Sequence, residues 1–355
     1  MATTTRTTSL DERHLDVVQP SLSRNLVLGI LGVAVAVAVA SYFLLDNNLA
    51  APVVAGFLLY VVPIYLLSRV REGKRRATDR GWTAVVTLAF IIAIIPLVSL
   101  VVTVVVEGAA RFDVEFFTSD MRGVVGEGGG VLHAIVGTLM ITLLAGVISV
   151  PVGIMCAIYL VEYGKGWLAR WTTFLVDVMT GIPSIVAGLF AFALFALLVD
   201  PGYRSGFMGS VALSVLMIPT VVRATEEMLK LVPNELREAS YALGVQKWRT
   251  ITRVVIPTAL AGIVTGVVLA VARVIGETAP LLLTAGFTTT LNWNPFEGRM
   301  TALPVFAYYS YVTPGVPPEP GYERAWTAAL VLIIIVLGLN LVARLVAVRF
   351  SPKKA

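Results

Sequence analysis

Arg273 and Glu277 are charged side chains inside the long apolar segment 258–285 of a chain that is 57% hydrophobic and only 14% charged. Their spacing of four residues predicts that they share one face of a helix, within pairing distance. An ionisable group in the centre of a bilayer costs at least about 2.5–3.5 kcal/mol on insertion scales, so such groups normally face a bundle interior or an aqueous path. The spacing alone leaves two interpretations open: a pair that neutralises itself and holds helices together, or functional groups along a path.

A second polar block lies between two long apolar segments, at about residues 223–257. It carries Glu238-Ala239-Ser240, then Gly244, and closes with Val254-Val255-Ile256-Pro257. The block is rich in Arg and Lys, and its pattern predicts a helical segment outside the membrane. In a chain that is otherwise almost all apolar, such a block indicates a docking segment for another protein.

The elements that position these residues are membrane-spanning helices. Apolar stretches of about 20 residues are long enough to cross a bilayer, and the sequence contains eight: about 26–45, 50–67, 82–106, 132–160, 171–199, 208–228, 258–285 and 326–348. We therefore predict an all-α integral membrane protein. Pro183 lies within the span 171–199 and removes one backbone hydrogen bond, so we expect a bend there, either as a packed kink or as part of a moving gate.

The basic residues predict the orientation, because Lys and Arg concentrate in cytoplasmic loops. Most of the 27 Lys and Arg residues fall in five segments: 1–25, 68–81, 161–172, 223–256 and 343–355. The loops on the other side hold only five arginines: Arg111, Arg122, Arg204, Arg299 and Arg324. We therefore expect both termini and the 223–257 block in the cytoplasm, and the net charge of +5 needs no nucleic acid to explain it. The run at 69–76 suits contact with anionic membrane lipid.

Several kinds of site are absent from the sequence. Cys156 is the only cysteine, which excludes a cysteine metal cluster, and His14 and His133 offer no ligand spacing. We therefore expect no metal site. There is no Gly-x-x-x-x-Gly-Lys-[Ser/Thr] motif, so the chain has no sequence basis for binding a nucleotide itself, and we expect no catalytic residues and no cofactor.

The 223–257 block resembles the EAA loop of ABC-importer permeases. Glu238, Ala239, Gly244 and Pro257 fall at the family spacing, while Ser240 is a mild departure. In that family the loop forms a coupling helix that docks on a cytoplasmic ATPase. The resemblance therefore implies that these four residues couple the chain to an ATPase dimer, and that ATP and Mg²⁺ bind in that partner subunit.

Three other segments are similar to the PstA-type permeases of phosphate ABC importers. They are Arg273-Val274-Ile275-Gly276-Glu277-Thr278-Ala279-Pro280, Gly181-Ile182-Pro183-Ser184, and Gly128-Gly129-Gly130 followed by Ile135-Val136-Gly137-Thr138. The resemblance implies a substrate path formed by Arg273, Glu277, Arg223, Thr278 and Ser184. For Arg223, at the end of the span 208–228, a simple charge anchor at the membrane surface is an equal alternative.

The resemblance also implies the organisation of the chain. Residues 82–355 correspond to the six-helix permease core, and residues 1–81 add a cytoplasmic tail, a two-helix hairpin and a basic linker, which departs from the family plan. The expected partners are a PstC-like second permease, a PstB-like ATPase dimer and a PstS-like phosphate-binding protein. The binding protein would contact the outer loop 286–325, and the alternative is that this loop is only a structured cap. The expected location is the bacterial inner membrane.

The expected function is the movement of inorganic phosphate by alternating access. A guanidinium offers permanent charge and a fork of donors that matches phosphate oxygens, and a neighbouring carboxylate can hold it in place. Another oxyanion, such as phosphonate or sulfate, is one alternative. An ion-coupled secondary transporter, with Arg273 and Glu277 as a proton or ion relay, is another.

Overall fold

The computed structural model describes residues 22–44 and 50–350, and every regular element in these ranges is a helix. Among these described residues, seven helices are long and apolar enough to cross a membrane, or up to eight if the bent pair α6–α7 counts as one span. The predicted all-α membrane fold is therefore confirmed. The chain forms two compact units, Met1–Leu100 and Val101–Ala355, and the boundary proposed at residue 81 stays a prediction.

The first unit contains α1 (Arg24–Leu44), α2 (Ala50–Arg71) and most of α3 (Lys74–Gly108). Gly73 joins α2 to α3 with a positive φ of 90°, a conformation that glycine adopts without steric cost. Glu72 beside it accepts hydrogen bonds from Leu22 N at 2.6 Å, from Ser68 Oγ at 2.6 Å and from the Arg80 guanidinium at 2.8 Å. One buried carboxylate thus ties the start of α1 to the α2–α3 turn.

Burial alone would raise the pKa of Glu72, but the hydrogen bonds from Ser68, Leu22 and Arg80 outweigh it and lower that pKa from 4.5 to about 2. A carboxyl with a lowered pKa stabilises the folded state above its unfolded pKa, and this contribution is lost as the pH falls from 4.5 towards 2. We expect Glu72→Gln to lower the midpoint of thermal unfolding by a few degrees at neutral pH, with the difference from wild type shrinking over that acidic window. Asp79→Asn, a change at an exposed carboxylate nearby, is the control. If both changes lowered the unfolding midpoint equally, the stabilising role assigned to the hydrogen bonds of Glu72 would be wrong.

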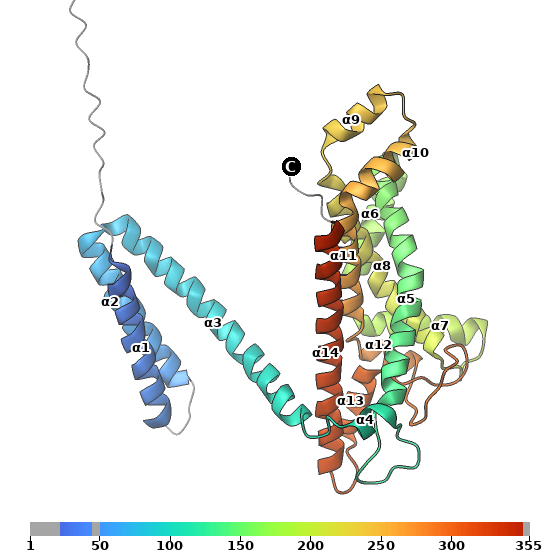
Figure 1. Ribbon diagram of the computed structural model, residues 1–355, viewed down its shortest axis with the longest axis horizontal. Helices are drawn as coiled ribbons and strands as arrows, with labels where there is room; N and C mark the ends of the chain where they lie inside the picture. Colours follow the sequence, from blue (N-terminus) through green and yellow to red (C-terminus); the bar gives the residue numbers. More distant parts are fainter. Residues whose placement is uncertain (1–21, 45–49, 351–355) are drawn as a thin grey trace, which may run out of the picture. The chain divides into compact units, whose positions relative to one another are not determined.

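The second unit holds the remaining helices. They are α4 (Val114–Thr118), α5 (Leu132–Ile158), α6 (Gly166–Gly181), α7 (Ser184–Leu198), α8 (Gly206–Lys230), α9 (Asn234–Ala242), α10 (Lys247–Thr250), α11 (Ile256–Val274), α12 (Ala279–Thr284), α13 (Leu303–Val312) and α14 (Glu319–Phe350). Two π-helical turns, η1 (Tyr159–Tyr163) and η2 (Ile251–Val255), interrupt the long helices. Figure 1 shows α5, α8, α11 and α14 running side by side as a bundle.

The bundle core lies between α5, α8 and α11. Ile141, Leu213, Met217 and Val274 are almost fully buried there. Helix association within a bilayer depends on close van der Waals packing rather than on the hydrophobic effect, so small residues at the contacts matter. Gly153 of α5 is such a residue, because a Cβ atom added there would come within 2.6 Å of the Val221 side chain on α8.

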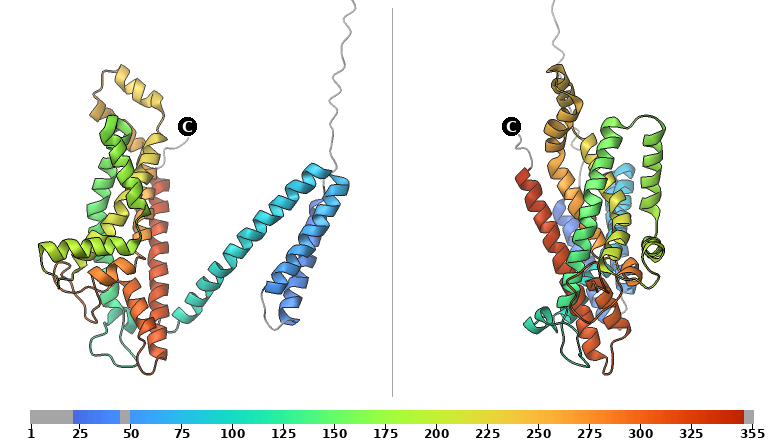
Figure 2. Two further views of the ribbon diagram at one scale, coloured as in Figure 1. Left: turned by 180° about the vertical axis from the view of Figure 1, so that it is seen from behind. Right: turned by 90° about the vertical axis from the view of Figure 1, so that its right-hand side faces the viewer.

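Two of the predicted continuous spans are broken. The expected span 171–199 is two helices, α6 and α7, bent by 108° at Ile182–Pro183, so that α7 runs across the bundle and is seen lengthwise in one view and end-on in the other (Figure 2). The residue before a proline is disfavoured in helical conformation, and Ile182 accordingly has ψ 129°. The sequence predicted a bend within one helix, whereas the structure has two separate helices at this point.

The expected span 258–285 also divides, into α11 and the short α12. Pro280 lacks the N–H that would bond to the carbonyl of Gly276, and its ring would crowd that carbonyl in a continuous helix, which favours a break here. The two breaks meet in space: a Cβ atom on Gly188 of α7 would lie 2.7 Å from Pro280 Cα of α12. This close crossing holds the start of α7 near the break after α11.

Candidate substrate path and coupling segment

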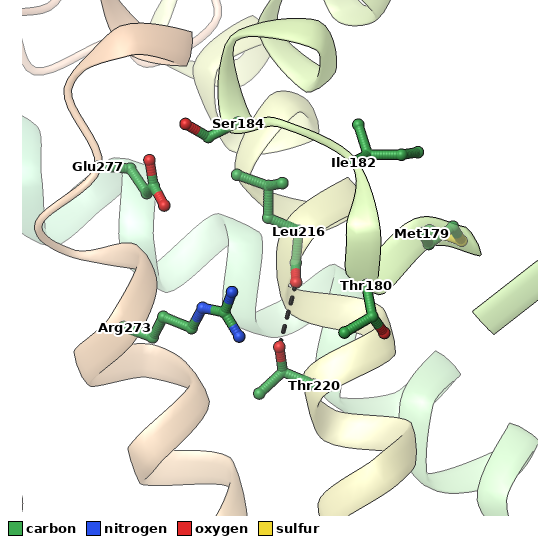
Figure 3. A pocket seen from close by; sticks show the side chains of 8 residues that line it. All are labelled: Met179, Thr180, Ile182, Ser184, Leu216, Thr220, Arg273 and Glu277. Atoms are coloured by element: carbon green, nitrogen blue, oxygen red, sulfur yellow. Dashed lines mark hydrogen bonds between the residues drawn. The ribbon is translucent and has the colours of Figure 1, made fainter. Parts of the chain in front are cut away.

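A polar cavity of about 220 Å³ lies where these broken helices face α8. Figure 3 shows its lining residues: Met179, Thr180, Ile182, Ser184, Leu216, Thr220, Arg273 and Glu277. They come from the end of α6, the start of α7, the middle of α8, and the end of α11 with the break that follows. The helix breaks thus bring Ser184 and Glu277 to the same cavity as Thr180, Thr220 and Arg273 of the helices.

Arg273 and Glu277 both face this cavity (Figure 3). The prediction that they share one helical face as a pair was wrong, because α11 ends at Val274 and Glu277 lies in the break beyond it. Within the described part of the chain, neither side chain forms a hydrogen bond or an ion pair. The guanidinium and the carboxylate are thus both available to a small polar ligand in the cavity.

Three hydroxyl groups complete the polar lining. Ser184 begins α7, Thr180 lies in the last turn of α6, and Thr220 of α8 donates to the Leu216 carbonyl at 3.3 Å. Of these, sequence reasoning singled out only Ser184. Thr220 precedes Arg223 by one helical turn within an apolar span, and that polar position was the signal that could have found it.

Thr278 and Arg223 do not belong to the cavity lining. Thr278 occupies the N-cap position of α12. Arg223 forms ion pairs with Asp177 of α6 and, at 2.7 Å, with Glu226 of α8, and Glu226 also pairs with Lys230 at 2.7 Å. This network links α6 to α8 and occupies the Arg223 guanidinium, so a direct role for Arg223 in the path stays a prediction.

The polar block predicted as a docking segment begins later than expected, because α8 continues to Lys230. Its central helix is α9, and its C-terminal end is a Schellman motif: Val245 N donates to Ser240 O at 3.2 Å and Gly244 N to Tyr241 O at 2.9 Å. Gly244 has φ 72°, which favours glycine strongly over residues with a side chain. The predicted glycine thus fixes the turn after α9.

The residues of this segment that resemble the EAA loop lie at the surface. Glu238, Ala239, Gly244 and Pro257 are all exposed. Leu243 beside them is 84% exposed and adds an apolar side chain to this surface. Pro257 lies in the first turn of α11, directly after η2, where the missing N–H of proline is tolerated.

An ion pair that sequence reasoning missed anchors α9 to the bundle. Arg237 donates to Glu162 Oε1 of η1 at 2.9 and 3.0 Å, and also to the carbonyls of Leu229 and Val232. The two side chains are only 13% and 5% exposed. Because they lie 75 residues apart, no local spacing predicts the contact. It joins the exposed helix rigidly to the end of α5.

The family of the chain follows from comparison with known proteins. Residues 149–355 match the sequence profile of the binding-protein-dependent transport system inner membrane components. The phosphate transport system permease protein PstA of Mycobacterium leprae is 48% identical over 274 residues, which cover 76% of this chain and 88% of the relative. The chain belongs to the PstA family of ABC-importer permeases.

More distant relatives agree with this family. The PstA protein of Yersinia pestis is 38% identical over 81% of this chain and 94% of its own length, and PstA 1 of Mycobacterium tuberculosis strain H37Rv is 47% identical over 77% and 88%. The resemblance seen in the motifs is thereby confirmed. A PstA-family chain is a membrane permease subunit, in agreement with the apolar helices found here.

Solved structures support the fold. A chain of a bacterial alginate ABC transporter, crystallised with its pentasaccharide-bound periplasmic protein, superimposes with a TM-score of 0.54 at 15% identity, covering 79% of this chain and 99% of that chain. A chain of the MetNI methionine ABC transporter, in an inward-facing conformation, superimposes with a TM-score of 0.50 at 21% identity. This match covers 63% of the present chain and 95% of the MetNI chain. Both likenesses concern the arrangement of helices alone.

Proposed function

We propose that this PstA-family chain is the transmembrane subunit of an ATP-driven importer for inorganic phosphate. The observation that carries the proposal is the unpaired Arg273 guanidinium in a polar cavity within the bundle. Phosphate must leave most of its water shell to cross the bilayer, and a guanidinium replaces that water with a permanent charge and a planar fork of donors. The names of the PstA relatives support phosphate as the anion.

The surroundings of Arg273 suit a site of moderate affinity. The cavity also receives the Ser184 end of α7, a helix of 15 residues, whose N-terminal N–H groups and dipole favour an anion. Glu277, facing the same space, opposes the anion by its negative charge. We infer that this opposition keeps phosphate from being held too tightly, so that it can leave towards the cytoplasm.

The chain supplies one half of the path. Arg273 is exposed in the isolated chain although it lies at the end of a membrane helix. Contact of this charged side chain with lipid would be energetically costly. A second, homologous permease of the PstC kind would cover this face and enclose the path. A phosphate-binding protein would deliver the anion from outside, on the face that carries the loop 286–325, and both chain termini would lie in the cytoplasm of the inner membrane.

The segment around α9 would transmit ATP-driven movement from the ATPase to the chain. ATP and Mg²⁺ would bind in a separate ATPase dimer, into which the exposed Glu238, Ala239 and Leu243 surface fits as a docking helix. The Glu162–Arg237 ion pair would carry a displacement of α9 to α5, and the tight α5–α8 packing would carry it to Thr220 at the cavity.

The test is transport by the assembled complex in proteoliposomes. We expect labelled phosphate to accumulate only when ATP is present on the side of the ATPase. Its uptake should be unaffected by collapse of the proton gradient, and excess sulfate or methylphosphonate should not compete with it. Uptake that follows the proton gradient instead would indicate a secondary transporter. Equal competition by sulfate would indicate a general oxyanion importer.

A further inference from the structure

The first unit contains an apolar groove that the proposed transport path does not use. It has a volume of about 430 Å³ and lies between α1, α2 and the first half of α3. All three helices contribute residues to its lining, among them Leu31, Ala38, Gly56, Tyr60, Ala84 and Thr87. Its volume and apolar lining suit a hydrocarbon chain.

Basic side chains continue the same helix faces at one end of this groove. On α1, the lining positions 31, 35 and 38 extend back at helical spacing through 28 to Arg24. On α2, positions 52, 56 and 60 extend through 63 and 67 to Arg71, and on α3, position 84 extends back through Arg80 to Arg76.

These basic residues meet at one end because α1, α2 and α3 alternate in direction. The contacts of Glu72 with Leu22 N and with Arg80 show that the start of α1, the end of α2 and the start of α3 lie together. Arg80 is occupied by Glu72, whereas Arg24, Arg71 and Arg76 are exposed.

From this arrangement we propose that the first unit binds an anionic phospholipid of the surrounding bilayer. One acyl chain occupies the groove, and the phosphate headgroup lies against Arg24, Arg71 and Arg76. Charge complementarity selects the occupant, since a zwitterionic lipid would fill the apolar part equally well but would gain less from three guanidinium groups.

The chain offers a matched control for the charges. Arg69 and Arg75 are equally exposed and lie on the same two helices, but their helical positions are on the sides away from the groove. Arg71→Gln with Arg76→Gln therefore removes the same charge from the same segment as Arg69→Gln with Arg75→Gln. Only the first pair changes the groove faces.

The experiment measures retention of phosphatidylglycerol and phosphatidylcholine by the full-length chain purified in detergent with its co-purifying subunits, using native mass spectrometry. We expect wild type to prefer phosphatidylglycerol. The Arg71/Arg76 variant should bind it about 30-fold more weakly, from the typical contribution of two basic residues at an anionic surface, and the Arg69/Arg75 variant should bind nearly as wild type does. Equal loss in both pairs, or equal binding of the two lipids by wild type, overturns the proposal.

A second pair of variants tests the groove without changing charge. Thr87→Trp places a large ring in the groove, and Val86→Trp places the same ring on the opposite, exposed face of α3. We expect loss of phosphatidylglycerol for Thr87→Trp alone. The proposal is also overturned if Thr87→Trp binds phosphatidylglycerol as wild type does. It is overturned as well if crosslinking shows that a helix of another subunit occupies the groove in place of lipid.

Discussion

Arg273→Gln is expected to reduce phosphate uptake by the reconstituted complex by roughly 10–100-fold. The change removes the permanent charge and the donor fork, and charge-assisted hydrogen bonds are worth about 1.5–3 kcal/mol each. It keeps a polar side chain of moderate length, so the bundle should still assemble. Arg273→Lys should give an intermediate rate, because lysine restores the charge without the planar fork.

The control for this prediction is Arg122→Gln, which removes an exposed arginine from the second unit outside the helices. It should leave uptake close to that of wild type. If Arg122→Gln and Arg273→Gln reduced uptake equally, the effect would come from the overall charge of the chain and not from the cavity.

The second large effect is expected at Gly244. Gly244→Leu should lower phosphate-stimulated ATP hydrolysis by roughly 5–30-fold, because a left-handed conformation costs a residue with a side chain about 1–2 kcal/mol. No atom within 4 Å would meet an added Cβ, so the effect arises from the backbone of the turn and not from a steric clash within the chain. The bundle itself should stay folded.

Gly244→Asn is the matched variant, since asparagine tolerates the left-handed region better than leucine does. It should retain most of the stimulated hydrolysis measured in the purified complex. Normal stimulation in Gly244→Leu would show that the turn after α9 does not position a docking helix, and would remove the assignment of this segment to coupling.

The fold class was predictable from the sequence because apolar length and basic loops report it directly. The helix breaks were not. Pro63, Pro96, Pro151 and Pro219 all lie inside unbroken helices, so a proline alone does not determine where a span ends. At the breaks near Pro183 and Pro280 the two segments pack closely, with Gly188 against Pro280, a tertiary contact that spacing along the chain cannot show.

The same limit applies to the site. Arg273, Glu277 and Ser184 were found from residue type and motif, and the structure brings them to one cavity. The expected Arg273–Glu277 pair failed because a spacing of four residues implies proximity only within a continuous helix. Arg223 has a local partner in Glu226, but its other partner, Asp177 of α6, lies 46 residues away, and the Arg237 partner in η1 lies 75 residues away. No local pattern identifies these two distant contacts.

In the proposed path, Arg273 contacts phosphate and does not merely hold helices together. The most direct test is phosphate uptake by the double variant Arg273→Gln with Glu277→Gln, in complexes matched for assembly. Removing both charges relieves any cost of an isolated carboxylate in a low-dielectric site. We predict that assembly is normal and that uptake stays as low as in Arg273→Gln alone. Recovery of near-normal uptake in the double variant would show that the two residues have only a structural role and that Arg273 does not contact phosphate.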